Sequence, residues 1–357
     1  FSPSREFEET LVKENLFFVV SGEHETLPSS EVRAILEAEG MRYRVRKQSF
    51  KLLSLEAPVE ALQKVNSRSS MCEACGIELF ECGGNLEEIL TKINETEFSR
   101  VIAPNQSFAV RIKRAAGTSR DLRRDVLERK IGEAVLRATR NTLVNLRQPD
   151  KVFLGVLSDG RFVFGIMTHT RQRGSIAARR PRRRPVFHPA TMPPKLARCM
   201  VNLARPKRGQ LLLDPFCGVG GILIEAGLVG CRVVGCDIKL EMLKGCLKNL
   251  EFFRISPVGV ARADARNLPF GPVNCIVADP PYGKSASTLG LTTANLLKSF
   301  LHNAGDQLLE NGFISLASPK TVGVTEFGRE AGLELVENHY VYVHRSLTRE
   351  IAVFRKR

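Results

Sequence analysis

Residues 211–221 read LLLDPFCGVGG, and the apolar helical pattern ILIEA follows at 222–226. An apolar run, a glycine-rich turn and a helical pattern predict a strand, a tight loop and a helix, because glycines let the backbone approach a ligand closely. Leu223 stands where the third glycine of a dinucleotide-binding G-x-G-x-x-G loop would fall. Asp214 precedes the loop and would repel a phosphate. The sequence therefore favours a cationic cofactor without phosphate groups.

Three further acids each close an apolar run in the same half of the chain. They are Asp237, Asp264 and Asp279, which follow Asp214 at successive intervals of 23, 27 and 15 residues. Each acid alone fits a solvated loop equally well, but their order favours one crevice at the carboxyl edge of a parallel sheet. S-adenosylmethionine (SAM) suits such a crevice, since a carboxylate can take both ribose hydroxyls. The residues expected to bind SAM are Asp214, Cys217, Gly218, Gly220, Asp237, Ile238, Asp264 and Ala265.

A second motif, Asp279-Pro280-Pro281-Tyr282-Gly283, directly follows the apolar run 275–278. Prolines lack amide donors and cannot continue a central strand, so the Pro280 carbonyl is left to accept a hydrogen bond from a substrate amine. Tyr282 can lie over a flipped base, and Asp279 can accept the proton that the amine loses. A Pro-Pro turn after an ordinary buried strand is the plain alternative. The predicted catalytic residues are Asp279, Pro280, Pro281 and Tyr282.

With both motifs, residues 190–357 resemble the SAM-dependent methyltransferases that methylate exocyclic amines and share a D/N-P-P-Y/F signature. The resemblance implies an α/β fold, with a doubly wound, seven-stranded sheet, helices on both faces and an antiparallel last strand at 351–354. The signature alone does not choose among adenine, cytosine, guanine and glutamine amides.

The formal net charge of +15 is concentrated in the middle of the chain. Residues 1–99 carry a net charge of −7, residues 100–194 carry +15 and residues 195–357 carry +7. A basic middle beside an acidic start indicates a localised footprint for nucleic acid. For the helical stretch 121–140, a solvated face whose arginines pair with acids is an alternative to RNA contact. Residues 171–184 hold seven arginines and no acid, so a partner or solvent must relieve the repulsion among these charges. The residues expected to contact RNA are Arg111, Lys113, Arg120, Arg123, Arg124, Arg179, Arg180, Arg182, Arg183 and Arg184.

The first 168 residues predict two small α+β units. The predicted elements of the first are a strand at 16–20, a helix at 28–38, strands at 43–46 and 50–55, a helix at 59–65 and a strand at 78–81. This order is typical of a ferredoxin-like domain. From residue 85 the pattern gives a helix, a strand at 107–112, a long helix at 121–140 and a hairpin that turns at Asp159-Gly160.

The helix-strand-helix-hairpin order, with its basic residues, resembles a THUMP domain, an RNA-binding module. With the segments FHPATMPPKLAR at 187–198 and HRSLTRE at 344–350, nearly the whole chain resembles the archaeal tRNA guanine-10 N2-methyltransferases. The resemblance implies transfer of one and then a second methyl group from SAM to guanine N2, with the THUMP unit gripping the acceptor end of tRNA. Related enzymes acting at tRNA position 6 or on ribosomal RNA tend to carry Asn in place of Asp279. They remain an alternative, as do DNA amine methyltransferases.

The implied domains are ferredoxin-like at 1–84, THUMP at 85–168, a basic linker at 169–190 and a Rossmann-like SAM-dependent methyltransferase at 191–357. A monomer is expected, and the sequence does not say whether an accessory protein takes part.

Cysteine spacing and hydropathy argue against a metal and against a membrane. Cys72-x-x-Cys75 followed by Cys82 lacks the second cysteine or histidine pair of a zinc site, so no metal is expected. A disulfide among these three and free core thiols are the alternatives. No signal peptide is evident and no apolar stretch approaches the roughly 18 residues that span a bilayer, which predicts a cytoplasmic protein.

Overall fold

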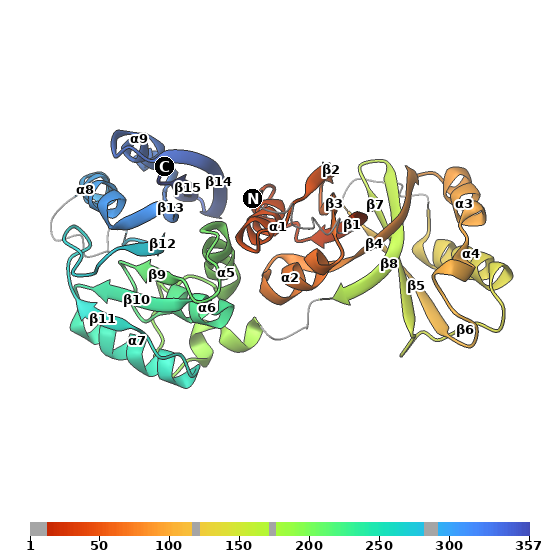
Figure 1. Cartoon of the computed structure of the whole chain (residues 1–357), viewed down its shortest axis with the longest axis horizontal. Coiled ribbons are helices and arrows are strands. Elements are labelled where there is room, and N and C mark those ends of the chain that lie inside the picture. The colour runs from red at the N-terminus through yellow and green to blue at the C-terminus, as the bar shows by residue number, and fades with distance from the viewer. Residues whose placement is uncertain (1–12, 116–121, 171–175, 282–291) are drawn as a thin grey trace, which may run out of the picture. The chain divides into compact units, whose positions relative to one another are not determined.

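The computed structural model describes residues 13–115, 122–170, 176–281 and 292–357. Two predicted site residues, Arg120 and Tyr282, lie outside these ranges. The chain divides into two compact units (Figure 1). The described residues of the first unit are 13–25, 40–67, 72–115 and 122–170, and those of the second are 26–39, 68–71, 176–281 and 292–357.

The first unit is built on one mixed sheet with the strand order β2-β3-β1-β4-β8-β7-β5-β6. Its strands are β1 (Lys13–Val20), β2 (Arg44–Ser49), β3 (Leu52–Pro58), β4 (Cys72–Gly83), β5 (Ser107–Arg114), β6 (Leu143–Val144), β7 (Lys151–Ser158) and β8 (Arg161–Thr170). Its helices are α2 (Glu60–Arg68), α3 (Leu86–Glu95) and α4 (Arg124–Ala138), with a 3₁₀ turn η1 (Phe98–Arg100).

The predicted strands and helices occur in the predicted order along the described part of residues 13–170, although the helix predicted at 28–38 groups with the second unit and the short strand β6 was not predicted. The turn of the β7–β8 hairpin has positive φ at both Asp159 (47°) and Gly160 (73°), which is the backbone that an Asp-Gly turn favours. The sheet continues across the predicted domain boundary, because β4 pairs antiparallel with β8. The strands on either side of the predicted boundary at 84/85 thus belong to one continuous sheet, and the division into two domains stays a prediction.

The second unit contains the seven-stranded sheet that the sequence predicts, in the order β11-β10-β9-β12-β13-β15-β14. The strands are β9 (Leu211–Asp214), β10 (Arg232–Asp237), β11 (Gly259–Arg262), β12 (Val273–Ala278), β13 (Leu308–Pro319), β14 (Glu334–His344) and β15 (Leu347–Arg355). Strands β9 to β13 run parallel, and β15 pairs antiparallel with both β13 and β14. The antiparallel last strand is therefore confirmed.

Helices cover both faces of this sheet (Figure 1). They are α1 (Leu27–Ala38), α5 (Pro194–Leu203), α6 (Gly221–Val229), α7 (Leu240–Phe252), α8 (Thr293–Gln307) and α9 (Val324–Glu330), with 3₁₀ turns η2 (Ala177–Arg179), η3 (Pro181–Arg183) and η4 (Lys320–Val322). One apolar core joins α5, α6 and α7 to the sheet, and a second joins α8 and α9 to it. Burial on both faces explains why β9 and β12 read as continuous apolar runs.

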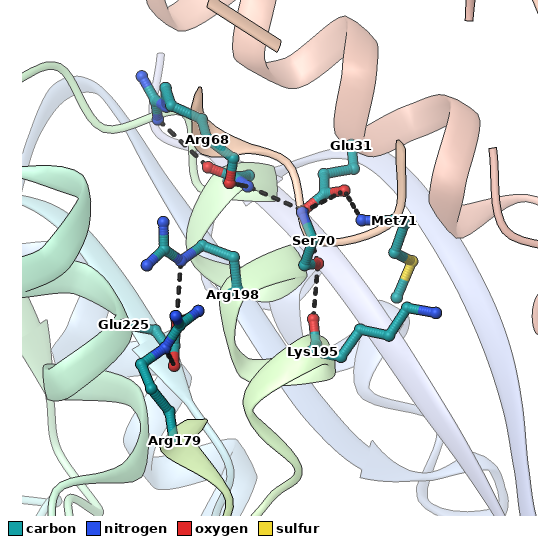
Figure 2. Close-up of polar contacts among 9 residues, drawn as sticks. Glu31, Arg68, Ser70, Met71, Arg179, Lys195, Arg198 and Glu225 are labelled. Atoms are coloured by element: carbon teal, nitrogen blue, oxygen red, sulfur yellow. Dashed lines mark hydrogen bonds and ion pairs between the residues drawn. The ribbon is translucent and has the colours of Figure 1, made fainter. Parts of the chain in front are cut away.

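Helix α1 groups with the second unit, although it lies in the segment 1–84 predicted as a separate domain. Figure 2 shows the reason: the carboxylate of Glu31, which is fully buried, accepts hydrogen bonds from the Ser70 and Met71 amides at 2.9 and 2.8 Å. The Asn202 side chain of α5 donates to it at 2.8 Å, and the Ser70 hydroxyl donates to the Lys195 carbonyl at 2.7 Å. These polar contacts attach α1 to α5.

Replacing Glu31 with Gln should lower the free energy of unfolding of the second unit by about 2–4 kcal/mol, because a buried carboxylate that satisfies several donors becomes an amide that cannot. Urea unfolding followed by a probe in this unit measures the change. The control is Glu251→Gln, an exposed carboxylate in the same unit, which should stay within about 0.5 kcal/mol. Equal effects of the two substitutions would contradict the assigned role of Glu31.

Candidate active site

The glycine loop between β9 and α6 is held in place by backbone hydrogen bonds to the next strand. The Cys217 amide donates to the Cys236 carbonyl at 2.9 Å, and the Gly220 amide donates to the Cys217 carbonyl at 2.7 Å. Gly220 has a φ of 86° and caps α6, and a Cβ built on it would lie 3.0 Å from the Cys246 Sγ. A side chain is excluded both by this conformation and by the close neighbour, so the loop needs glycine here.

Asp237 closes β10 and is oriented by two amides. Its Oδ2 accepts from the Gly218 amide at 3.0 Å and its Oδ1 accepts from the Lys239 amide at 2.9 Å. The carboxylate retains lone pairs for further donors, and it is half-buried beside the glycine loop. This arrangement suits a vicinal diol, and the predicted neighbour Ile238 is half-buried next to it.

Asp264 follows β11 and is held by a neighbour that the sequence analysis did not select. The Arg266 guanidinium donates to both of its carboxylate oxygens, and the Arg266 amide donates to Oδ1 at 2.9 Å. These hydrogen bonds hold the pKa of Asp264 below its usual range. Asp264 therefore presents a fixed anion, and Ala265 beside it is buried.

Asp214 lies at the centre of the carboxyl edge and is almost completely buried. Burial raises the pKa of Asp214 well above its usual range; a hydrogen bond from the Phe216 amide opposes the rise, and the charges of Asp279 and Asp237 add to it. These acids lie close enough to interact, as the sequence predicts for strand ends at one edge. A cation bound here would relieve this concentration of negative charge.

Asp279 follows β12, and Pro280 after it is buried. The guanidinium of Arg349 on β15 lies 3.8 Å from the Asp279 Oδ1, and both side chains are mostly buried. Arg349 is within the quoted segment 344–350, yet nothing in that segment alone connects it to Asp279. The connection depends on β15 lying next to β13, which is a pairing distant in sequence.

The cysteines carry no metal site in the described structure. All nine are free and buried, so the alternative of a disulfide among Cys72, Cys75 and Cys82 is not what the structure has. Within residues 13–115, 122–170, 176–281 and 292–357, no group of His, Cys, Asp or Glu side chains is arranged to hold a metal ion. A hydrogen bond with the Cys246 thiol, together with burial, raises the pKa of Cys217 far above its usual range, so this thiol is no nucleophile.

The predicted RNA-contacting residues of the first unit form hydrogen bonds and ion pairs of differing strength within the protein. Arg111 donates to the Leu146 carbonyl at 2.6 Å, and Lys113 pairs with Glu73 at 3.2 Å. Arg123 pairs with Asp125 at 2.7 Å, which is the solvated pairing offered as an alternative. Arg124 on α4 is well exposed and lies 3.8 Å from Glu128. Such exposed pairs are weak and leave the guanidinium available to phosphate.

In the second unit, the arginine run separates into two groups. Arg180, Arg182 and Arg183 are exposed, and the Arg182 guanidinium lies 5.9 Å from the ring centre of Phe187, which is also exposed. Arg179 and Arg184 are different, because Arg179 pairs with the buried Glu225 at 2.8 Å and Arg184 is itself buried.

For Arg179 and Arg184 the prediction of phosphate contact is therefore corrected. The expectation that only a partner or solvent relieves the charge repulsion within residues 171–184 is wrong for Arg179. This arginine pairs with Glu225 of α6, which is distant in sequence.

A seven-stranded sheet with one antiparallel strand, a glycine loop after the interior strand β9 and acids at the strand ends define a Rossmann-like methyltransferase. The RMKL-like methyltransferase domain family matches residues 181–351, and a DNA methylase family matches residues 96–248. A tRNA (guanine(10)-N2)-dimethyltransferase from Methanothermobacter thermautotrophicus is 36% identical over 96% of this chain and 99% of its own length. The chain belongs to the tRNA (guanine(10)-N2)-dimethyltransferase family.

One further comparison concerns the family and another concerns the fold alone. A protein of the same name from Methanocaldococcus jannaschii is 33% identical over 95% of this chain and 99% of its own length. The crystal structure of TrmN from Thermus thermophilus superposes with a TM-score of 0.54 at 21% identity, covering 96% of this chain and 100% of that one, which shows the shared fold.

Among the described residues, no helix combines the length and apolar character that crossing a membrane requires.

The raised pKa of Asp214 predicts a pH-dependent affinity for S-adenosylhomocysteine, which carries an ammonium group. The neutral acid must ionise to hold this cation, so the affinity should increase as pH rises towards the folded pKa of Asp214, by up to about tenfold per pH unit. Calorimetric titrations from acidic to neutral pH measure the effect. Asp214→Asn should bind more weakly and with a flat profile, whereas an unchanged profile in this variant would contradict the assignment.

Proposed function

We propose that this protein transfers methyl groups from SAM to the exocyclic N2 of guanosine at position 10 of tRNA, first one and then a second. The observation that carries the proposal is the Asp279-Pro280 pair at the end of β12, two strands from Asp237 and adjacent in the sheet to the glycine loop. The relatives that cover nearly the whole chain carry this activity in their names.

The proposed SAM site uses the residues of the carboxyl edge. SAM supplies a methyl group on a sulfonium, which is an electrophile that needs no further activation by the protein. Asp237, oriented by the Gly218 and Lys239 amides, takes the ribose hydroxyls, and Asp264 and Ala265 meet the adenine. Cys217, Gly218 and Gly220 form the loop under the cofactor, and Asp214 faces its ammonium group.

Asp279 carries the chemistry on the side of the base. The guanine N2 lone pair is delocalised into the ring, so hydrogen bonds from the amine to the Asp279 carboxylate and the Pro280 carbonyl draw the nitrogen towards a tetrahedral geometry and orient it. The Asp279 carboxylate then takes the proton released after attack. The guanidinium of Arg349 lies 3.8 Å from the Asp279 Oδ1 and places a positive charge beside this carboxylate. Tyr282 and Pro281 complete the predicted clamp.

The second methyl transfer sets a stricter demand, because the monomethylated amine has one N–H left. We propose that Asp279 holds this remaining N–H, while the first methyl occupies the side that the Pro280 carbonyl faced. Mass spectrometry of the product of pure protein with excess SAM tests this step, since an exclusively monomethylated guanosine would reject it.

The first unit has the proposed task of gripping RNA. We propose that residues 1–84 are a ferredoxin-like domain and residues 85–168 a THUMP domain that binds the acceptor end of tRNA. Support comes from the element order, from the exposed Arg124 of α4 and from the half-buried cations of β5. The protein works as a monomer in the cytoplasm under this proposal.

A different target nucleotide is the second candidate. A tRNA (guanine(6)-N2)-methyltransferase from Archaeoglobus fulgidus is 26% identical over 82% of this chain, a weaker match than the position 10 relatives. The match to the DNA methylase family ends at residue 248, so Asp279 and Pro280 lie outside the matched residues. Locating the methylated nucleotide in a treated tRNA decides between these candidates.

Replacing Asp279 with Ala should lower the kcat of methyl transfer by about 100-fold or more, because the amine loses its orienting acceptor and its proton acceptor together. Binding of tRNA, measured by filter retention, should stay within about twofold of the wild type, since phosphate contacts elsewhere supply the affinity. The control is Asp306→Ala, an exposed acid on α8, which should change neither quantity. Equal losses of transfer and binding in Asp279→Ala would contradict the assigned role.

Replacing Arg182 or Arg183 with Gln should weaken tRNA binding and flatten its dependence on salt. Each phosphate contact that is lost reduces the slope of log affinity against log salt by about 0.7–1. Titrations at several ionic strengths provide the slopes. Lys248→Gln removes an equal charge from exposed α7 and serves as the reference. A slope equal to that of Lys248→Gln would show that the arginine run does not touch RNA.

A further inference from the structure

A cluster of buried charges lies behind the glycine loop, and its positive members outnumber its negative one. Glu225 on α6 is fully buried. The Arg179 Nε donates to its Oε1 at 2.8 Å and the Arg198 Nε donates to its Oε2 at 2.9 Å, as Figure 2 shows. Arg184 is buried in the same neighbourhood and feels the charges of both Glu225 and Arg179. One carboxylate thus faces three guanidinium groups.

Arg184 is the member of this cluster whose hydrogen bonds are incomplete. Its Nε donates to the Arg179 carbonyl at 3.0 Å. Its Nη1 and Nη2 are shielded from solvent and have no hydrogen-bond partner among the residues that the structure describes, while the residue as a whole is 5% exposed. A buried guanidinium is costly unless acceptors satisfy it, and for these two nitrogens the described protein supplies none.

The unsatisfied end of Arg184 lies against the start of α6. A Cβ built on Gly221, the first residue of that helix, would lie 3.6 Å from the Arg184 Nη1. The first turn of α6 contains no acid, and its cap is Gly220, so no side chain of the helix start offsets the positive end of its dipole. A guanidinium placed at that positive end is unfavourable by itself. An anion between the two would satisfy both.

We propose that Arg184 and the first amides of α6 bind the carboxylate of the methionine part of SAM. This inference rests on the proposed function and extends it to the cofactor's amino-acid end. The carboxylate is the one anionic group of SAM, and it can accept hydrogen bonds both from a guanidinium and from amides at a helix start. Asp214, the last residue of β9, takes the ammonium group, so the two charges of the amino acid meet opposite charges of the protein.

A phosphate of the RNA backbone is the competing anion. It fits less well, because the guanidinium of Arg184 is buried whereas Arg182 and Arg183, its neighbours in sequence, are exposed. S-adenosylhomocysteine keeps the same carboxylate, so Arg184 should hold substrate and product cofactor equally. Its role is to position the methionine chain, and no proton or methyl group passes through it.

Decarboxylated SAM tests the inference, because it keeps the sulfonium and the ammonium group and lacks only the carboxylate. In calorimetric titrations without tRNA, the wild type should bind SAM about 10- to 100-fold more tightly than decarboxylated SAM, as expected for a charge-assisted hydrogen bond pair. Arg184→Gln should lose this factor for SAM and S-adenosylhomocysteine and bind decarboxylated SAM as the wild type does. Arg184→Lys, which keeps the charge with fewer aligned donors, should fall between.

Arg232→Gln is the control, since it removes an exposed arginine from the amino end of β10 and should leave all three affinities unchanged. Equal weakening of SAM and decarboxylated SAM in Arg184→Gln would overturn the inference, as would weakened tRNA binding with normal SAM binding. If Arg184→Gln fails to fold, the wild-type comparison and Arg184→Lys still decide the matter. A wild-type protein that binds no SAM at all would refute the proposed function itself, whereas SAM binding indifferent to Arg184 refutes only this inference.

Discussion

The catalytic unit depends on β9 being hydrogen-bonded in parallel to both β10 and β12. Parallel pairing brings the carboxyl ends of the three strands to one edge, so Asp214, Asp237 and Asp279 become neighbours although up to 65 residues separate them. Burying an acid beside two others is unfavourable, since burial first, and the charges of Asp279 and Asp237 after it, raise the pKa of Asp214. The cost is offset when a cation occupies the edge, which makes a sulfonium cofactor with an ammonium group a natural ligand.

Buried carboxylates with many donors organise the helices on one face of this sheet. Glu31 ties α1 to the Ser70–Met71 backbone and to α5, and Glu225 gathers arginines from η2 and α5 behind the glycine loop (Figure 2). Both acids are fully buried, so losing either would leave donors unsatisfied. The same networks fix α5 and α6, which share one core, and α6 begins directly after the glycine loop, so packing is connected with the geometry of the cofactor site.

Local sequence predicted the elements and the edge acids, because apolar runs, glycines and Asp-Pro-Pro leave short-range signals. These short-range signals do not identify contacts between residues that are distant in sequence. The Arg349–Asp279 contact needs the β13–β15 pairing, and the Glu225 partner of Arg179 comes from an unrelated helix. The charge of residues 171–184 predicts RNA contact for Arg179 and Arg184, because the sequence does not show which arginines of a charged run are buried. The attachment of α1 to the second unit was missed for the same reason, as Glu31 looks like any helix-surface acid.

Nucleoside-resolved mass spectrometry of two tRNA transcripts tests the central claim most directly, with one transcript carrying guanosine and the other inosine at position 10. Inosine lacks the exocyclic amine and is otherwise nearly identical, so it removes only the group that Asp279 and Pro280 are proposed to hold. The account predicts dimethylated guanosine at position 10 of the first transcript and no methylation of the second. Methyl groups at the same site in both transcripts, or at another nucleotide, would contradict it.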